Sequence, residues 1–199
     1  MYGVRRYSRS VRVDRVYYGS ERGVIVTTAI CGRVITLGDE INTDVIAPGQ
    51  WKQESLEVLK LHTMEGIVPQ FFQQVQSGDI LVAGRNFGCG SHREQAVQVM
   101  QALGIQAIVA ESVARLYLRS GIALGLPVFE VPGISALVAA GEMLKISFRQ
   151  DAICFANCRT QEEILRPALP PMMREVLLSG GIYQLLRTRI YESDSAGQS

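Results

Sequence analysis

The stretch Asn86-Phe87-Gly88-Cys89-Gly90-Ser91-His92-Arg93-Glu94-Gln95-Ala96 decides the fold, because it joins a buried strand to an amphipathic helix. The apolar run 79–84 leads into it and predicts a buried strand, while 94–103 predicts a helix. Glycines at Gly88 and Gly90 stand at the crossing, where they let backbone amides approach a ligand closely. A strand-to-helix crossing of this kind is where open α/β sheets bind ligands.

Ser91 and Glu94 have the S-x-x-E spacing of a capping box, which predicts Ser91 as the N-cap of the helix. The free N–H groups and the positive dipole end of the helix would then lie beside its hydroxyl. Such a place holds a carboxylate or phosphate and stabilises an anion on a nearby oxygen. Arg93 adds a guanidinium that grips a carboxylate with two hydrogen bonds. We therefore expect an anion pocket that carries one serine hydroxyl.

A purely structural interpretation of the same stretch stays open at this point. Gly-rich strand-to-helix turns are common, and S-x-x-E is often only a helix cap. The G-x-G pair lacks the third glycine of a dinucleotide fingerprint, since Arg93 stands there, and no G-K-[ST] phosphate loop is present. The pattern therefore favours an anion site over a nucleotide site.

Bulk composition indicates one soluble domain. The chain has 199 residues, of which 47% are hydrophobic and 20% charged, with a net charge of +1. No overall field favours nucleic acid or an anionic membrane, and no apolar run is long enough to span a bilayer. We expect a cytoplasmic protein that acts on neither nucleic acid nor membrane.

The cysteines do not form a metal-binding pattern. No secretory signal is visible, so we expect free thiols. Cys154 and Cys158 are four apart, which is not a C-x-x-C pair, and only His62 and His92 could assist them. We therefore expect no metal site in this chain, and we interpret Cys89 as a small residue packed under the turn.

Composition divides the chain into three parts. Residues 1–22 hold six arginines against two acidic residues, a net charge of +4 that leaves −3 for the remainder. We expect a loose basic extension there, with a transit peptide or a segment for an acidic partner as alternatives. A single domain is expected over 23–191, followed by a disordered polar tail over 192–199.

Strands and helices alternate after the Gly-rich loop, which predicts a parallel sheet covered by helices. The expected strands are 23–30, 32–37, 79–84, 106–110 and 126–131, with further strand-like runs in 142–158. The expected helices are 54–64, 68–76, 94–103, 112–124, 134–141, 172–179 and 182–190.

Four stretches in a fixed order carry a family resemblance. Gly38-Asp39-Glu40-Ile41-Asn42-Thr43-Asp44-Val45-Ile46 is similar to a G-D-x-I-N-T-D-x-I motif, and the run 79–91 is similar to a strand followed by a serine loop. The runs 107–115 and 125–128 continue in the expected order. Over 32–131, and more loosely to 190, the sequence resembles the aconitase superfamily, in particular the small subunits of 3-isopropylmalate dehydratases.

That resemblance implies an α/β fold, a three-layer β/β/α swivelling domain of the aconitase C-terminal type. It also implies half of an enzyme: a partner large subunit would hold a [4Fe–4S] cluster on three cysteines, with one iron open to substrate. This chain would bind no cofactor itself. The implied reaction is a hydro-lyase isomerisation of a 2-hydroxy diacid, in which 2-isopropylmalate becomes 3-isopropylmalate in leucine synthesis.

The resemblance also implies roles for individual residues. Ser91 would be the base that removes a proton next to a carboxylate, and Arg93 would hold a substrate carboxylate. Asp44 would lie near the active centre, although a turn-capping role for it stays open. Gly90, His92 and Thr43 would contribute to substrate binding.

Departures from the family pattern leave the substrate open. The family usually has G-S-S-R-E, and here His92 replaces the second serine, while Gln95 stands where histidine is frequent. Ser120 stands where asparagine is frequent, and the loop 48–52 has no secure match to the family's specificity loop. The alternatives are a dehydratase acting on homoaconitate, dimethylmalate or another 2-hydroxy diacid, or a non-catalytic anion-binding domain.

Overall fold

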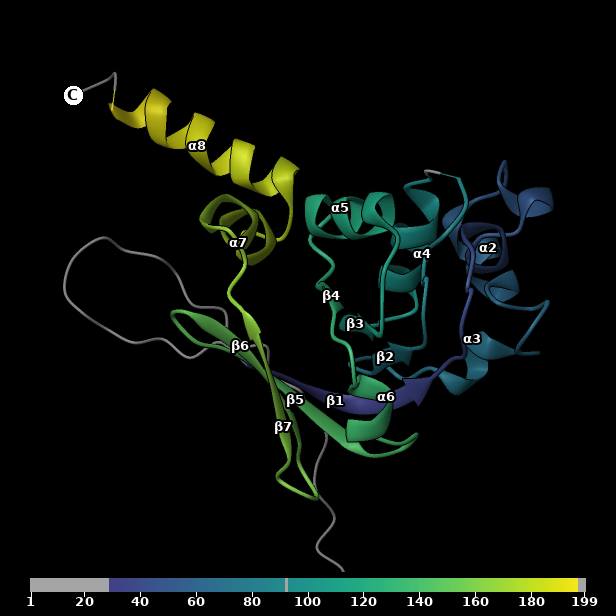
Figure 1. The fold of residues 1–199 in the computed structure, drawn as a ribbon. Coiled ribbons are helices and arrows are strands. Elements are labelled where there is room, and N and C mark those ends of the chain that lie inside the picture. Colours follow the sequence, from purple (N-terminus) through teal and green to yellow (C-terminus); the bar gives the residue numbers. More distant parts are fainter. Residues whose placement is uncertain (1–28, 92, 197–199) are drawn as a thin grey trace, which may run out of the picture.

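The fold is built on one seven-stranded sheet with the strand order β4-β3-β2-β1-β5-β6-β7 (Figure 1). The computed structural model describes residues 29–91 and 93–196, with side chains to Tyr191. The basic extension expected over 1–22 and the residue His92 lie outside the described residues.

The first half of the sheet is parallel and buried. It consists of β1 (Ala29–Thr36), β2 (Ile80–Ala83), β3 (Ala107–Ala110) and β4 (Val128–Glu130). Every residue of β2 and β3 is buried, as expected for short apolar strands covered on both faces. The sequence prediction of a parallel sheet is correct for this half.

The second half is antiparallel and was only partly predicted. β5 (Met143–Phe148) pairs with β1, then β6 (Ala152–Asn157) with β5, and β7 (Glu163–Pro167) with β6. The two strands expected over 24–37 are one strand within the described residues, because β1 continues through Gly32. β1 therefore serves both halves, parallel to β2 and antiparallel to β5.

Helices cover the parallel half and the C-terminal end. They are α1 (Thr43–Ile46), the 3₁₀ turn η1 (Gly49–Trp51), α2 (Leu56–His62), α3 (Phe71–Gln74), α4 (Gln95–Ala102), α5 (Arg115–Ala123), α6 (Ile134–Leu137), α7 (Pro171–Leu178) and α8 (Ile182–Ala196). Figure 1 shows α2, α4 and α5 together on one side of the parallel strands. α8 runs to Ala196 and so includes the first residues of the tail expected to be disordered.

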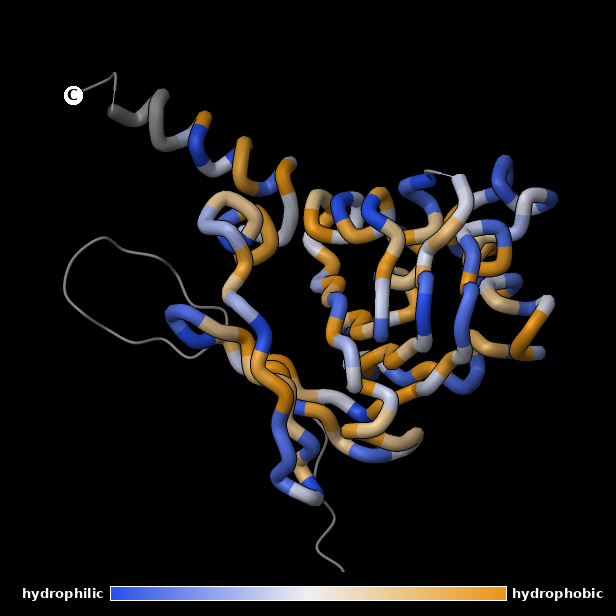
Figure 2. The backbone as a smooth tube through the Cα atoms, viewed as in Figure 1, coloured by the Kyte–Doolittle hydropathy of each residue, from blue (hydrophilic) through white to orange (hydrophobic). Residues whose placement is uncertain are grey.

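Two hydrophobic cores lie on opposite faces of the parallel strands, which gives the three layers β/β/α. Leu81 and Ala83 of β2 pack in the core beneath α2 and α4. Ile80 and Val82 alternate with them and pack in the other core, with Leu144 and Phe155 of the antiparallel half. Hydrophobic residues accordingly concentrate along the strands in Figure 2. Among the described residues, no helix is long and apolar enough to cross a membrane.

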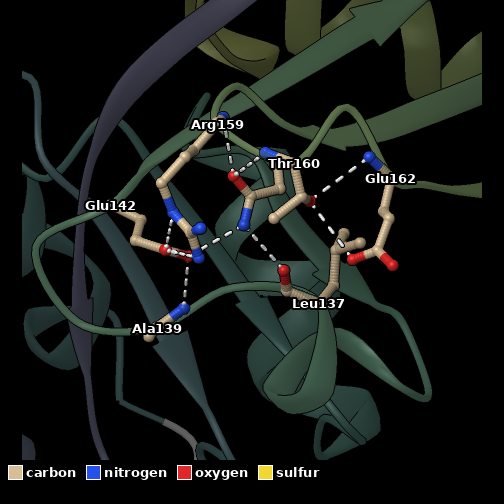
Figure 3. A network of polar contacts seen from close by, with 7 residues as sticks. Leu137, Ala139, Glu142, Arg159, Thr160 and Glu162 are labelled. Atoms are coloured by element: carbon tan, nitrogen blue, oxygen red, sulfur yellow. Dashed lines mark hydrogen bonds and ion pairs between the residues drawn. The ribbon is translucent and has the colours of Figure 1, made fainter.

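A buried asparagine at the end of β6 joins this strand to α6 and to the chain after it. Figure 3 shows its partners Leu137, Glu142, Arg159 and Thr160 close together. Asn157 is 1% exposed, and its Nδ2 donates to Leu137 O at 2.9 Å and to Glu142 Oε2 at 2.8 Å. Its Oδ1 accepts from the amides of Arg159 and Thr160. The pKa of the Glu142 carboxyl lies below its usual range, mainly because the backbone N–H of Ala139 donates to it and secondly because Arg159 does. The amide of Asn157 is thus fully used inside the protein.

Replacing Asn157 with alanine should destabilise the fold, because buried hydrogen-bonding groups lose their partner. We expect a loss of about 1–3 kcal/mol in the free energy of unfolding, measured by urea denaturation. Thr160→Ala is the matched control, since Thr160 belongs to the same network but is exposed. A change within about 0.5 kcal/mol is expected for the control. Equal stability of both variants would show that the network does not support the hairpin.

Candidate active site

Two loops that leave neighbouring parallel strands are bound together beyond the sheet. Leu37 N donates to Val82 O at 2.8 Å within the sheet, and Gly84 N donates to Gly38 O at 3.1 Å just past it. The pairing continues through Glu40 N to Arg85 O, Gly88 N to Ile41 O, and Thr43 N to Cys89 O, at 2.7–2.8 Å. The Asp39–Asp44 loop and the serine loop 84–93 thus form one unit at the carboxyl ends of β1 and β2.

The other side of the serine loop is attached to the segment before α5. Phe87 N donates to Ser112 O at 3.0 Å, and Ala114 N donates to Phe87 O at 2.9 Å. Gly88, at φ +74°, presses on the ring of Tyr117, so that a Cβ there would lie 2.3 Å from the ring carbon Cγ. Because only glycine fits this contact, the serine loop lies directly against the first turn of α5.

Ser91 is not the N-cap of α4, so this prediction was wrong. α4 begins at Gln95, its N-cap position is Glu94, and no side chain caps it. The carbonyl of Ser91 instead accepts a hydrogen bond of 2.9 Å from Thr43 Oγ1, and Gly90, at φ +101°, turns the chain beside it. The hydrogen bond from Thr43 therefore holds Ser91 outside the helix. This tertiary contact overrides the local capping signal.

Asp44 and Arg93 form an ion pair across the two loops. Lys52 also contacts this carboxylate oxygen, with its Nζ 3.4 Å from Asp44 Oδ1. The hydrogen bond from Arg93, followed by that from Lys52, holds the pKa of the Asp44 carboxyl below its usual range. Capping of α1 is done by Asn42, whose Oδ1 accepts from Val45 N at 2.9 Å, so the capping alternative for Asp44 falls away.

A cavity of about 240 Å³ opens where the two loops face α5. The loops line it with Thr43, Gly88, Gly90, Ser91 and Arg93, and the helix side contributes Ala114, Arg115, Leu116, Tyr117 and Ser120. The first amides of α5 have no acceptor within the helix, so its positive end faces this side of the cavity. The helix N-terminus at the site is therefore that of α5 and not that of α4.

The structure brings together the described residues that the sequence singled out for the site. Ser91 and Arg93 line the cavity with Gly90, while Asp44 binds Arg93 from outside it. Thr43 is buried, lines the cavity and donates its hydroxyl hydrogen to Ser91 O, and its part in substrate binding stays a prediction. The predicted contribution of His92 lies outside the described residues.

Sequence reasoning missed three neighbours of the site. Lys52 reaches Asp44 from a loop that could not be matched to any motif, and Gln95 Nε2 donates to its carbonyl at 3.3 Å. Arg115 and Tyr117 line the cavity, although the run 107–115 was recognised without a role for its arginine. The signal that could have found Arg115 and Tyr117 is the strand β3, whose carboxyl end precedes them and lies beside the serine loop.

Cys89 is the cysteine of the serine loop. Burial, followed by the charge of Glu40, raises the pKa of the Cys89 thiol, which disfavours the thiolate. Among residues 29–91 and 93–196, no three His, Cys, Asp or Glu side chains gather to hold a metal ion.

Replacing Arg93 with methionine should raise the pKa of Asp44 toward its ordinary value, because the main hydrogen bond to the carboxylate is lost. Carboxyl ¹³C NMR titration measures this directly, and Lys52→Met should give a smaller rise in the same direction. The folded-state pKa lies below the unfolded one, so the pair stabilises the fold above the unfolded-state pKa. That contribution is lost as pH falls through the folded-state pKa.

The stability cost of Arg93→Met should therefore be present at neutral pH and shrink as the medium becomes acidic. It should stay below about 1 kcal/mol, since the Asp44 side chain is 57% exposed and solvent screens the pair. An Asp44 pKa that does not respond to Arg93→Met would remove the ion pair from the site.

The chain is similar to a known protein family and to curated relatives. Residues 41–129 match the family described as Aconitase C-terminal domain. The 3-isopropylmalate dehydratase small subunit 1 of Methanopyrus kandleri is 39% identical over 79% of this chain and 92% of its own length. The methanogen homoaconitase small subunit of Methanothermobacter thermautotrophicus is 43% identical over 77% of this chain and 88% of its own.

A solved structure agrees in fold as well as in sequence. The crystal structure titled 3-isopropylmalate dehydratase, from Methanocaldococcus jannaschii, superimposes with a TM-score of 0.75 at 32% identity, covering 85% of this chain and 99% of that chain. The family match over residues 41–129 includes Asp44, Ser91 and Arg93. The chain belongs to the family of 3-isopropylmalate dehydratase small subunits, whose fold is the aconitase C-terminal domain.

Proposed function

We propose that this chain is the small subunit of a hydro-lyase that isomerises 2-isopropylmalate to 3-isopropylmalate in leucine biosynthesis. The observation that carries the proposal is the cavity where Ser91 and Arg93 meet at the carboxyl ends of parallel strands. Relatives of similar length that carry the dehydratase name support it. The reaction removes water across two carbons and adds it back in the opposite sense.

Ser91 is the base in this proposal. Removal of the proton next to a carboxylate leaves an electron pair that forms the alkene as the hydroxyl departs, and in the return step water adds and Ser91 gives the proton back. A serine hydroxyl is a poor base in water, but Arg93 and the first turn of α5 line the same cavity. The positive charge of Arg93 and the positive dipole end of α5 lower the free-energy cost of forming an alkoxide at Ser91.

Arg93 binds a substrate carboxylate in this proposal, and Asp44 holds the Arg93 side chain in place. Asp44 Oδ1 contacts Nη1 of the guanidinium, which has five N–H donors. The remaining donors are sufficient for a carboxylate in the cavity. Because the side chain of Arg93 is only 24% exposed, it has little freedom to turn away from the substrate.

A large subunit completes the active site in this proposal. Its [4Fe–4S] cluster, when bound, supplies a Lewis acid for the departing hydroxyl. The loops 39–44 and 84–93 would face that subunit, since Ser91 is exposed in the isolated chain. The chain itself contributes the base and the carboxylate-binding arginine.

Homoaconitate is the second candidate substrate. The homoaconitase small subunit is 43% identical to this chain, close to the 39% of the dehydratase relative, so identity alone does not separate the two. A screen of 2-hydroxy diacids with the co-expressed large subunit tests this, and 2-isopropylmalate should give the highest kcat/KM. A higher value for homoaconitate would replace the proposed substrate and keep the reaction type.

Replacing Ser91 with alanine should lower turnover by about 100-fold or more, since a lost general base has this effect. Substrate binding through Arg93 should persist, and stability should stay within about 0.5 kcal/mol because Ser91 is exposed and caps no helix. Arg93→Lys keeps the charge but loses the two-pronged contact, so it should mainly weaken binding. Near-normal turnover of a folded Ser91→Ala variant would move the base to another residue, with His92 the first to test.

The isolated chain should be colourless and inactive, and activity should appear only with the large subunit. The measurement combines the visible spectrum of the anaerobically purified chain with turnover of 2-isopropylmalate before and after addition of the partner. An iron–sulfur spectrum and turnover by the chain alone would contradict the division of labour proposed here. An assembled complex that binds the diacid without turnover would instead favour the non-catalytic anion-binding domain.

A further inference from the structure

Arg115 is a second arginine of the cavity that has no role so far. It is the first residue of α5, its side chain is exposed, and it lines the cavity from the helix side. Within the described part of the chain, its guanidinium forms neither an ion pair nor a hydrogen bond, in contrast to Arg93. It is therefore a cation at the cavity without a counterion among the residues that the structure describes.

The charges around the cavity fit a dianion. The Asp44 carboxylate offsets one of the two positive charges that Arg93 and Lys52 carry, so these three side chains together keep a net charge of +1. Among the described residues that line the cavity, the charged side chains are Arg93 and Arg115, and both are positive. A monocarboxylate would compensate only one of them, whereas a dicarboxylate matches both.

The geometry of the loop fixes the position of the second cation relative to the first. Gly88 lies against Tyr117 so closely that no Cβ fits, and Phe87 exchanges hydrogen bonds with the residues on either side of Val113. These contacts attach the serine loop to the start of α5. Arg93 and Arg115 thus belong to two rigidly joined elements, and the volume of about 240 Å³ suits a ligand smaller than a drug molecule.

We propose that Arg115 binds the second carboxylate of the diacid whose first carboxylate is held by Arg93. This inference rests on the proposed function for the identity of the diacid, but its charge argument concerns dicarboxylates in general. Arg115 would then give the site its preference for diacids over monoacids of the same shape.

The test compares two ligands that differ in one carboxylate: 2-isopropylsuccinate, which lacks the hydroxyl and cannot be dehydrated, and 4-methylpentanoate. Isothermal titration calorimetry with the assembled two-subunit protein measures both dissociation constants for wild type and Arg115→Gln. Loss of a charged hydrogen bond should weaken the diacid about 10- to 100-fold. The monoacid should change by less than about twofold, and Arg115→Lys should recover part of the diacid affinity.

Arg119→Gln is the matched control, since Arg119 is also exposed and lies one turn further along α5 outside the cavity lining. It should bind both ligands as wild type does. Equal weakening of diacid and monoacid by Arg115→Gln, or loss of subunit assembly by size-exclusion chromatography, would overturn the proposal. Turnover of 2-isopropylmalate by the wild type is measured separately. A protein without turnover can therefore be distinguished from one in which Arg115 does not bind a carboxylate.

Discussion

The parallel pairing of β1 with β2, continued by hydrogen bonds beyond the sheet, is the constraint on which the site depends. The last contacts of this series are Thr43 N to Cys89 O and Thr43 Oγ1 to Ser91 O. Each strand alone would leave its loop free in solution. Because the two loops share their backbone hydrogen bonds, Asp44 and Arg93 meet although they lie far apart in the sequence. The backbone of the serine loop is therefore attached to the β1 loop as far as Ser91.

Glycine and charge complete this arrangement in different ways. Gly84 leaves room for Asp39, since a Cβ there would lie 1.9 Å from Asp39 Oδ1, and Gly88 leaves room for Tyr117. These close approaches place the serine loop between the β1 loop and α5. Asp44 then holds Arg93, while Arg115 stays without a counterion among the described residues. The site thus combines a fixed backbone with an excess of positive charge, which is what an anionic substrate needs.

Much of the fold was readable from the sequence because its elements are set by local patterns. The buried strand before the serine loop and the helix after it follow from apolar runs and their period. β7 escaped detection because alternating polar residues and Pro167 make an edge strand look like a break. The capping role of Ser91 failed since the contact with Thr43 is tertiary, and Arg115 went unassigned because nothing local connects it to Arg93.

A crystal structure of the assembled enzyme with 2-isopropylsuccinate bound tests the central claim most directly. We predict that the ligand lies in the cavity between the serine loop and α5, with one carboxylate on Arg93 and Ser91 Oγ facing the carbon that carries the exchangeable proton. A ligand bound away from this cavity, with Ser91 and Arg93 both turned to solvent or covered by the large subunit, would contradict it.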